Sequence, residues 1–187
     1  LGANNLTSAF NTTTSVYSGI ISGTGSFTKN GTGVLALAGA NTYTGGTTVA
    51  AGSLSIGNGG ASGSVAGNIT NNATVIFNRS DAFVYNNVIS GTGAVTQAGS
   101  GSTTLNGVNT YTGTTTVAAG TLQVGDSTHT SARITNNVAV TGGTLTGYGT
   151  IVGNITNGGN VSSAQMNFLT LTGNYTQTST GTLTVQA

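Results

Sequence analysis

Residues 21–57 read ISGTGSFTKNGTGVLALAGANTYTGGTTVAAGSLSIG, and residues 89–125 read ISGTGAVTQAGSGSTTLNGVNTYTGTTTVAAGTLQVG. At a constant offset of 68, without a gap, 23 of these 37 positions are identical. A shorter echo, GNIT, occurs at residues 67–70 and again at 153–156. The chain therefore contains an internal duplication, which is typical of repeat architectures.

Within each copy, short runs alternate between inward-type residues and small or polar ones, a pattern that predicts half-buried strands. Ala-Gly pairs at residues 51–52 and 119–120 separate these strands as turns. The expected inward residues are Leu35, Leu37, Thr47, Val49, Leu54 and Ile56 in the first copy, and Thr103, Leu105, Thr115, Val117, Leu122 and Val124 in the second.

Inward residues return about every 20 positions, which predicts the coils of a β-solenoid. From Leu37 to Ile56 is 19 residues, and from Ile56 to Val75 is another 19. The 68-residue repeat would then span about three coils, each stacked on its neighbours. A two-sheet sandwich is the competing all-β interpretation, but it would need more aromatic core and more charge on its solvent face.

We expect one all-β solenoid over residues 1–187, with duplicated units at 21–57 and 89–125 and a looser C-terminal part at 138–187. The expected inward residues of that last part are Val138, Val140, Leu145, Ile151, Ile155, Val161, Leu169, Leu171, Leu183 and Val185.

Charge is nearly absent from the 187 residues. Three Lys or Arg and two Asp or Glu make 3% of the chain, against about 25% in an ordinary soluble domain. Nucleic-acid binding is excluded, because it requires several basic residues to neutralise phosphates. No apolar run approaches the roughly 20 residues of a membrane span, so we expect no direct membrane insertion. The chain begins at Leu1 instead of Met, which indicates an excised fragment.

The stretch from Gly25 to Gly57, and its copy from Gly93 to Gly125, resembles the passenger-associated transport repeat of bacterial autotransporters. The family pattern runs from a Gly-x-Gly pair through Leu-x-Leu, Asn-Thr-Tyr-Thr-Gly, Thr-Thr-Val and Ala-Gly-Thr-Leu to a closing Gly. The second copy departs from it, with STTL at 102–105 where VLAL stands at 34–37. The C-terminal part, residues 149–177, is similar to segments near the end of such passengers.

This resemblance implies a right-handed parallel β-helix that forms outside a Gram-negative cell, at the cell surface or as an extracellular protein. In that family an outer-membrane β-barrel of the parent chain exports the passenger, and the repeat is associated with efficient transport. No series of lipid-facing strands follows in this chain, so the barrel would belong to another part of the parent protein.

Candidate catalytic residues are few. Hydrolysis of a polysaccharide needs two facing carboxylates, and the only two carboxylate side chains, Asp81 and Asp126, sit at non-equivalent places in the repeat. Arg79 more plausibly forms an exposed ion pair with Asp81. Ser127 and His129 could form a nucleophile–base–acid set with Asp126, but a solvated loop histidine is the favoured interpretation.

Aromatic residues offer two further interpretations. Tyr43 and Tyr111 occupy the same repeat position, either as a platform for sugar rings or, as we favour, as corner tyrosines with the hydroxyl in solvent. Residues 83–85, Phe-Val-Tyr, form either an exposed contact or a strand whose alternate residues are buried. With no Cys and one His, no metal site, catalytic site or cofactor is expected.

The leading hypothesis is a non-enzymatic stalk of a surface-displayed or secreted autotransporter passenger, supporting adhesion, self-association or transport. Its expected partners are a second copy, through solenoid faces or ends, or a carbohydrate or protein of a host surface or matrix. A self-assembling extracellular filament or matrix subunit is the alternative. A polysaccharide-active enzyme is the less favoured third hypothesis.

Overall fold

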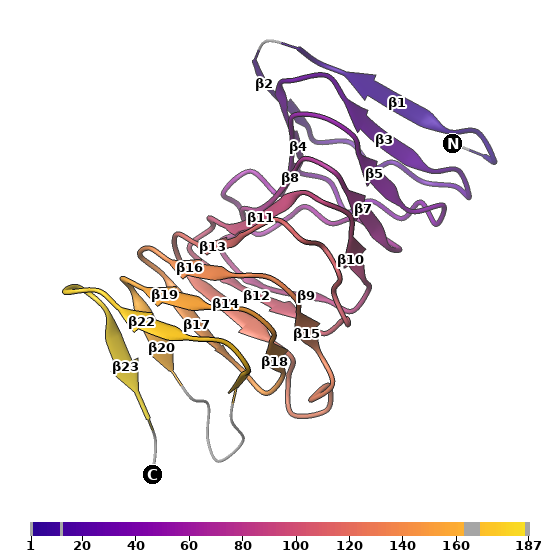
Figure 1. Cartoon of the computed structure of the whole chain (residues 1–187). Helices are drawn as coiled ribbons and strands as arrows, with labels where there is room; N and C mark the ends of the chain where they lie inside the picture. The colour runs from indigo at the N-terminus through magenta and orange to yellow at the C-terminus, as the bar shows by residue number, and fades with distance from the viewer. Residues whose placement is uncertain (1, 12, 163–168, 186–187) are drawn as a thin grey trace.

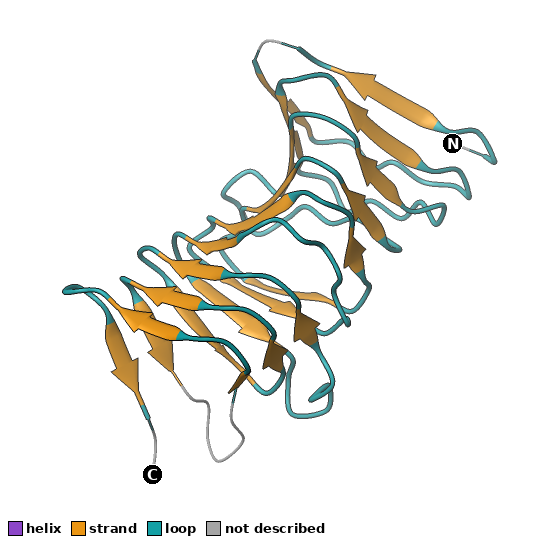
Figure 2. Cartoon of the chain, in the orientation of Figure 1, coloured by secondary structure: helices purple, strands orange, loops and turns teal. Residues whose placement is uncertain are grey.

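The computed structural model describes residues 2–11, 13–162 and 169–185. Over those ranges the chain folds into short strands joined by turns, and every pair of hydrogen-bonded strands is parallel (Figures 1 and 2). No helix in the described part is long and apolar enough to cross a membrane. The all-β, parallel solenoid predicted from the repeats is confirmed, with coils of about 20 residues.

Each coil passes through three faces, which we number in chain order. Face 1 comprises β1 Leu6–Ala9, β3 Phe27–Asn30, β5 Thr47–Val49, β7 Ile69–Asn71 and β10 Ile89–Ser90, and further along the axis β15 Arg133–Ile134, β18 Thr150–Ile151 and β21 Thr170–Leu171. Face 2 comprises β2 Thr14–Tyr17, β4 Val34–Leu37, β6 Ser53–Ile56, β8 Thr74–Phe77, β11 Ala94–Gln97, β13 Thr115–Val117, β16 Val138–Val140, β19 Ile155–Asn157 and β22 Tyr175–Gln177. Face 3 comprises β9 Ala82–Tyr85, β12 Ser102–Leu105, β14 Thr121–Val124, β17 Thr144–Gly147, β20 Asn160–Ser162 and β23 Thr182–Thr184.

The two sheets of face 1 are continuous through a segment that is not a strand. The Thr110 N–H donates to the Ile89 carbonyl of β10 at 2.9 Å, and the Asn109 N–H donates to the Arg133 carbonyl of β15, also at 2.9 Å. Residues 109–112 therefore stack between β10 and β15, and backbone hydrogen bonds run along the axis on all three faces.

The interior is filled by the residues that the alternation predicted. All twelve inward positions of the two copies are buried. In the looser C-terminal part, the expected inward residues from Val138 to Val161 are buried as well, while Leu169 and Leu171 are partly buried. Leu183 and Val185 are 49% and 65% exposed, so the prediction that they face a closed interior is wrong. They lie on or beside β23, whose sheet has no further strand beyond it.

The second copy of the repeat is rotated by one face relative to the first. Phe27 begins a column of paired residues that continues through Thr47 and Ile69 to Ile89, three coils later. Its repeat equivalent, Val95, lies six residues past Ile89, on the next strand along the chain. The offset of 68 is therefore three coils plus one face, where about three coils were expected. The strands of the first copy lie on faces 1 and 2, and those of the second lie on faces 2 and 3.

Coil length varies by a few residues, which the constant spacing of 19 did not foresee. Leu37 pairs with Ile56, but Ile56 pairs with Phe77, 21 residues on, and Val75 belongs to the neighbouring column. The Ala-Gly turns are where they were predicted. Gly52 there has a φ of 67°, and a Cβ at this position would lie 2.5 Å from the Gly31 carbonyl oxygen of the coil below. Glycine is therefore required by both conformation and stacking.

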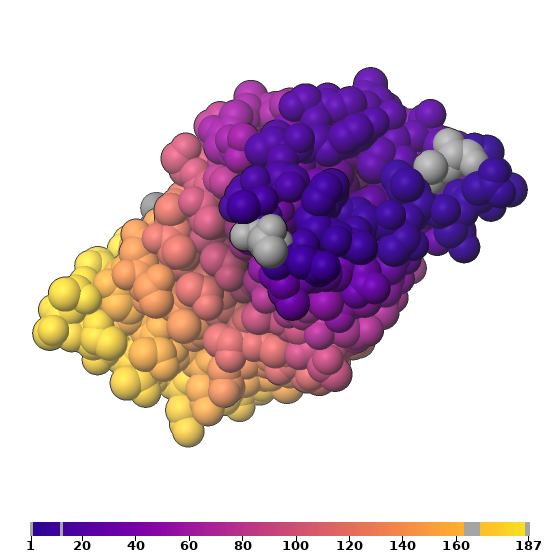
Figure 3. All heavy atoms as spheres, turned by 90° about the horizontal axis from the view of Figure 1, so that it is seen from above, coloured from indigo at the N-terminus to yellow at the C-terminus, as the bar shows by residue number. Residues whose placement is uncertain are grey.

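The stack is open at both of its described ends. An apolar cavity of about 350 Å³ opens among β1, β2 and β4, and one of about 240 Å³ opens among β19, β20, β22 and β23. In the view of Figure 3 the indigo N-terminal residues face the viewer and the yellow C-terminal ones lie farthest from them, so the coils follow one another along the axis.

Candidate functional site

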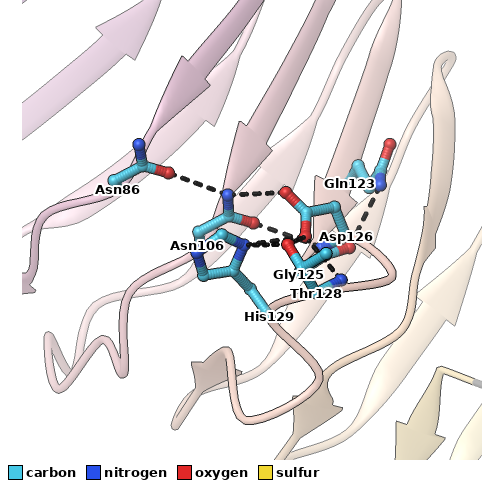
Figure 4. Close-up of polar contacts among 7 residues, drawn as sticks. All are labelled: Asn86, Asn106, Gln123, Gly125, Asp126, Thr128 and His129. Atoms are coloured by element: carbon cyan, nitrogen blue, oxygen red, sulfur yellow. Dashed lines mark hydrogen bonds and ion pairs between the residues drawn. The ribbon is translucent and has the colours of Figure 1, made fainter.

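The densest group of polar and ionisable side chains lies at the corner that follows face 3 (Figure 4). There Asp126 follows β14 and receives hydrogen bonds on both carboxylate oxygens. Its Oδ1 accepts from the Thr128 backbone N–H at 2.9 Å, the Thr128 Oγ1 at 2.7 Å and the His129 Nδ1 at 2.7 Å. Its Oδ2 accepts from the Asn106 Nδ2 at 2.9 Å. These bonds, those from Thr128 and His129 above all, hold the pKa of Asp126 well below its usual range.

Asn106 connects this corner to the coil before it. Its Nδ2 also donates to the Asn86 Oδ1 at 2.8 Å, and its Oδ1 accepts from the Asp126 backbone N–H at 3.2 Å. Asn86, Asn106 and Asp126 therefore form a ladder along the axis with one residue per coil. Asn106 is buried, whereas the His129 side chain is 45% exposed.

The arrangement resembles two thirds of a catalytic triad. Asp126 orients His129 through Nδ1, as an acid orients a general base. Ser127 is exposed, and among the described residues it makes no hydrogen bond with His129. Of the three residues considered from the sequence, the structure brings together Asp126 and His129 and leaves the hydroxyl apart. What the geometry accounts for is a corner closed by Asp126, with its histidine on an exposed loop.

Asp81 lies before β9 and has a separate set of partners. Arg79 donates to its carboxylate from Nε at 2.9 Å and from Nη2 at 2.7 Å, and this lowers the pKa of Asp81. Arg79 also donates to the Gly63 and Ala61 carbonyls, and its guanidinium carbon lies 4.9 Å from the centroid of the Phe83 ring. Only 12% of the Arg79 side chain is exposed. The expectation of an exposed pair is therefore wrong for Arg79, which ties loop 58–63 to the strand behind it.

The two repeat tyrosines are interior residues. Tyr43 and Tyr111 are both 0% exposed. The Tyr111 hydroxyl bonds to the Thr115 Oγ1 at 2.7 Å, and Tyr43 makes the same bond to Thr47. Burial raises the pKa of each tyrosine to about 12. The structural interpretation holds, but the hydroxyls are buried instead of solvated, and neither ring has a face open to a sugar.

Residues 83–85 form strand β9, so the second of the two interpretations given for this segment is confirmed. Tyr85 is buried, Phe83 packs partly against the core, and Val84 between them is 51% exposed.

Two buried asparagines were not singled out from the sequence. The Asn41 Oδ1 accepts from the Ile21 N–H at 2.8 Å, and its Nδ2 donates to the Gly39 and Ser64 carbonyls at 3.0 and 2.8 Å. Asn109, its repeat equivalent, makes the same three bonds to Ile89, Gly107 and Arg133. The signal that could have identified them is that this asparagine is identical in both copies although it lies among inward residues.

Lys29 is a buried cation without an anionic partner among the described residues. It is 0% exposed, and its Nζ donates to the Asn30, Gly31 and Ala51 carbonyls at 2.9, 2.7 and 3.2 Å. Burial lowers the pKa of Lys29. The equivalent residue of the second copy, Gln97, donates to the Gly99 carbonyl at 2.9 Å. Both residues cap the turn that follows their strand, so the role is structural in each copy.

No group of three or more His, Cys, Asp or Glu that could hold a metal ion occurs within residues 2–11, 13–162 and 169–185. The side chains described above therefore carry no ligand assignment, and whether any of them acts catalytically stays a prediction.

Comparison with known proteins places these features in a family. The model of the passenger-associated transport repeat matches residues 27–56 and 95–124, which contain the strands of the two copies. The chain is 43% identical over 95 residues, half of its length, to the adhesin BmaC autotransporter of Brucella suis biovar 1 (strain 1330). That stretch covers only 3% of the relative's own length. No solved structure matches the chain significantly. The two repeats, the parallel solenoid and this similarity identify the chain as a passenger segment of the autotransporter family.

Proposed function

We propose that this chain is a stalk segment, which holds adhesive regions of its parent protein away from the cell and supports their export. Membership of the passenger family places the chain outside a Gram-negative cell, displayed on the surface or secreted. The relative is named an adhesin, and adhesion by the parent of this chain is part of the proposal.

The observation that carries the proposal is the uninterrupted face 2. Its nine described strands pair in sequence from β2 to β22, with no break at the boundaries of either repeat. Parallel strands stack about 4.8 Å apart, so each coil adds a fixed rise and the segment acts as a spacer. Stacked coils contact only their neighbours, which allows such a rod to form from one end as the chain emerges.

A non-enzymatic role is part of this proposal. Asp81 and Asp126 each have their own hydrogen-bonding partners, and those bonds account for the carboxylate oxygens described above. Neither comparison points to a polysaccharide-active enzyme or to a filament subunit. Linkage to an outer-membrane barrel in the parent chain, and self-association through faces or ends, are likewise proposed.

Removal of the segment from the parent protein tests the proposal. Surface display, measured with an antibody to a tag upstream of the segment, and attachment of whole cells should both fall when residues 1–187 are deleted. Deletion of residues 27–88 alone removes three whole coils, since the column that begins at Phe27 returns at Ile89. That shorter deletion should preserve display. Unchanged display and attachment after the full deletion would show that the segment is not a stalk.

A further inference from the structure

Two ladders of hydroxyl groups run along the outside of the solenoid, on different faces. On face 1 each outward residue pairs with the next, one coil further on: Thr7, Thr28, Thr48, Thr70 and Ser90. On face 2 the corresponding column contains Thr96, Thr116, Ala139, Thr156 and Thr176. The spacing within a ladder is that of neighbouring strands, about 4.8 Å.

The rotation of the repeat creates the second ladder. Thr28 and Thr48 of the first copy are equivalent to Thr96 and Thr116 of the second, at the offset of 68. Because that offset is three coils plus one face, the same pair of threonines points out of face 1 in one copy and out of face 2 in the other. A whole number of coils would have placed both pairs in one line.

The threonine hydroxyls of both ladders are free to bind. All eight threonines are exposed or half-buried, and within the described ranges none of their hydroxyls has a hydrogen-bond partner in the protein. Inward threonines behave differently, since the hydroxyls of Thr47 and Thr115 are bonded to tyrosines. β-Branched side chains on strands are stiff at χ1, so each ladder is ordered before a ligand arrives.

We propose that each ladder binds a linear, uncharged polysaccharide that lies along the solenoid axis, so that one chain of this protein holds two glycan strands on two faces. The inference rests on the proposed function, because it gives adhesion a ligand class. A hydroxyl both donates and accepts hydrogen bonds, as sugar hydroxyls do. A ligand that repeats in one dimension suits a ladder with one hydroxyl in each coil.

Charge and area select this ligand over others. None of the five charged side chains lies on either ladder: Lys29 is buried, and the others lie on face 3, at its corners or on β15. An anionic polymer would therefore find no cation there. Five strands span only about 24 Å along the axis, a strip one residue wide, whereas a stable protein interface buries about 800 Å² on each partner. The ladders also lack the Trp, Tyr and Arg anchors that dominate protein interfaces.

The test is the retardation of the purified 187-residue chain in native gels that contain hydroxyethylcellulose, an uncharged linear glucan, or heparin, a charged one. The variants are Thr28→Val with Thr48→Val on face 1, Thr96→Val with Thr116→Val on face 2, and all four together. Valine keeps the β-branched shape and the strand preference, so the coils should still form. The matched control is Thr42→Val with Thr44→Val, two exposed threonines outside the ladders.

We expect the neutral glucan to retard the wild-type chain and the control equally. Each ladder variant should lower the retardation at least twofold, and the fourfold variant should abolish it while its circular dichroism stays unchanged. Three results would overturn the proposal: no retardation of the wild type by the neutral glucan, retardation by heparin alone, or equal loss in the control. A fourth would be sedimentation showing that the ladder variants abolish a dimer of the chain instead. None of these results affects the display assay, so failure of the ladders and failure of the stalk are distinguishable.

Discussion

The Oδ1 of Asn41 accepts a hydrogen bond from the backbone N–H of Ile21 across one coil, at 2.8 Å, and Asn109 and Ile89 repeat this bond at 2.9 Å on another face. The amide nitrogen of each asparagine also bonds a carbonyl of its own coil and one of the next coil. One side chain thus joins three successive coils at the segment where the backbone leaves the strand ladder. This explains an asparagine in the interior of a stack otherwise filled by Val, Leu and Ile.

Replacement of Asn41 or Asn109 by Ala should destabilise the chain strongly. The change leaves one backbone N–H and two carbonyls without partners, and an unsatisfied buried group costs about 1–3 kcal/mol. We expect a loss of roughly 3 kcal/mol for each asparagine, measured by urea unfolding. Asn72→Ala, at an exposed position, is the control. If the three variants unfold at the same urea concentration, the asparagines do not hold the coils together.

The stability contributed by Lys29 should depend on pH. Burial lowers its folded-state pKa below the usual 10.5, so the folded chain releases this proton before the unfolded chain does. Stability relative to Lys29→Gln should therefore rise as the pH increases through the folded pKa, and should level off above 10.5. Lys29→Gln places the residue of the second copy at this site and removes the titration. A constant difference between pH 8 and 11 would contradict the assignment.

The interior tyrosines should produce a loss of stability in alkali. The pKa values of Tyr43 and Tyr111 are raised to about 12, while tyrosines of the unfolded chain titrate near 10. Their contribution is complete below pH 10 and is lost as the pH rises from 10 toward 12. The double variant Tyr43→Phe, Tyr111→Phe should show a shallower decline in alkali. At neutral pH it should lose about 1 kcal/mol for each hydroxyl bond removed. An unchanged alkaline decline would show that these hydroxyls are accessible in the folded chain.

Protonation of Asp126 should open its corner only in strong acid. Its depressed pKa means that the hydrogen bonds to Thr128 and His129 persist through the range in which ordinary carboxylates protonate, and are lost as the pH falls through the lower folded pKa. Amide exchange of Thr128, followed by NMR, should stay slow below pH 4 in the wild type. In Asp126→Asn it should be fast at every pH, while exchange in β14 is unaffected. Exchange that quickens near pH 4 in the wild type would contradict the lowered pKa.

Deletions should be tolerated when they remove whole coils. Removal of residues 27–88 joins Ser26 to Ile89, which belongs to the same column as Phe27, so β10 can pair with β1. We expect a folded, monomeric chain with a lower melting temperature by circular dichroism. Removal of residues 27–78 places Arg79 in that column instead and should leave the chain unfolded or aggregated. Similar melting curves for the two deletions would show that coil register does not control folding.

The sequence alone determined the local part of this structure. Strand alternation identified inward residues such as Leu37, Ile56 and Leu105, because period-two burial depends only on neighbours along the chain. The internal repeat indicated a solenoid for the same reason, since one coil is the unit that recurs. The repeat motif also led to the autotransporter family before any coordinate was considered.

Only the tertiary structure decided which face each repeat occupies and how its buried polar groups are satisfied. The partners of Asn41 lie 20 residues before it and 23 after it, and coils of unequal length separate those positions. The rotation by one face is the sum of such lengths over three coils, so it depends on how the coils stack and not on the repeat pattern. The same stacking buries Lys29, Tyr43 and Tyr111 and leaves the ladder threonines outside, because burial is set by the neighbouring coils.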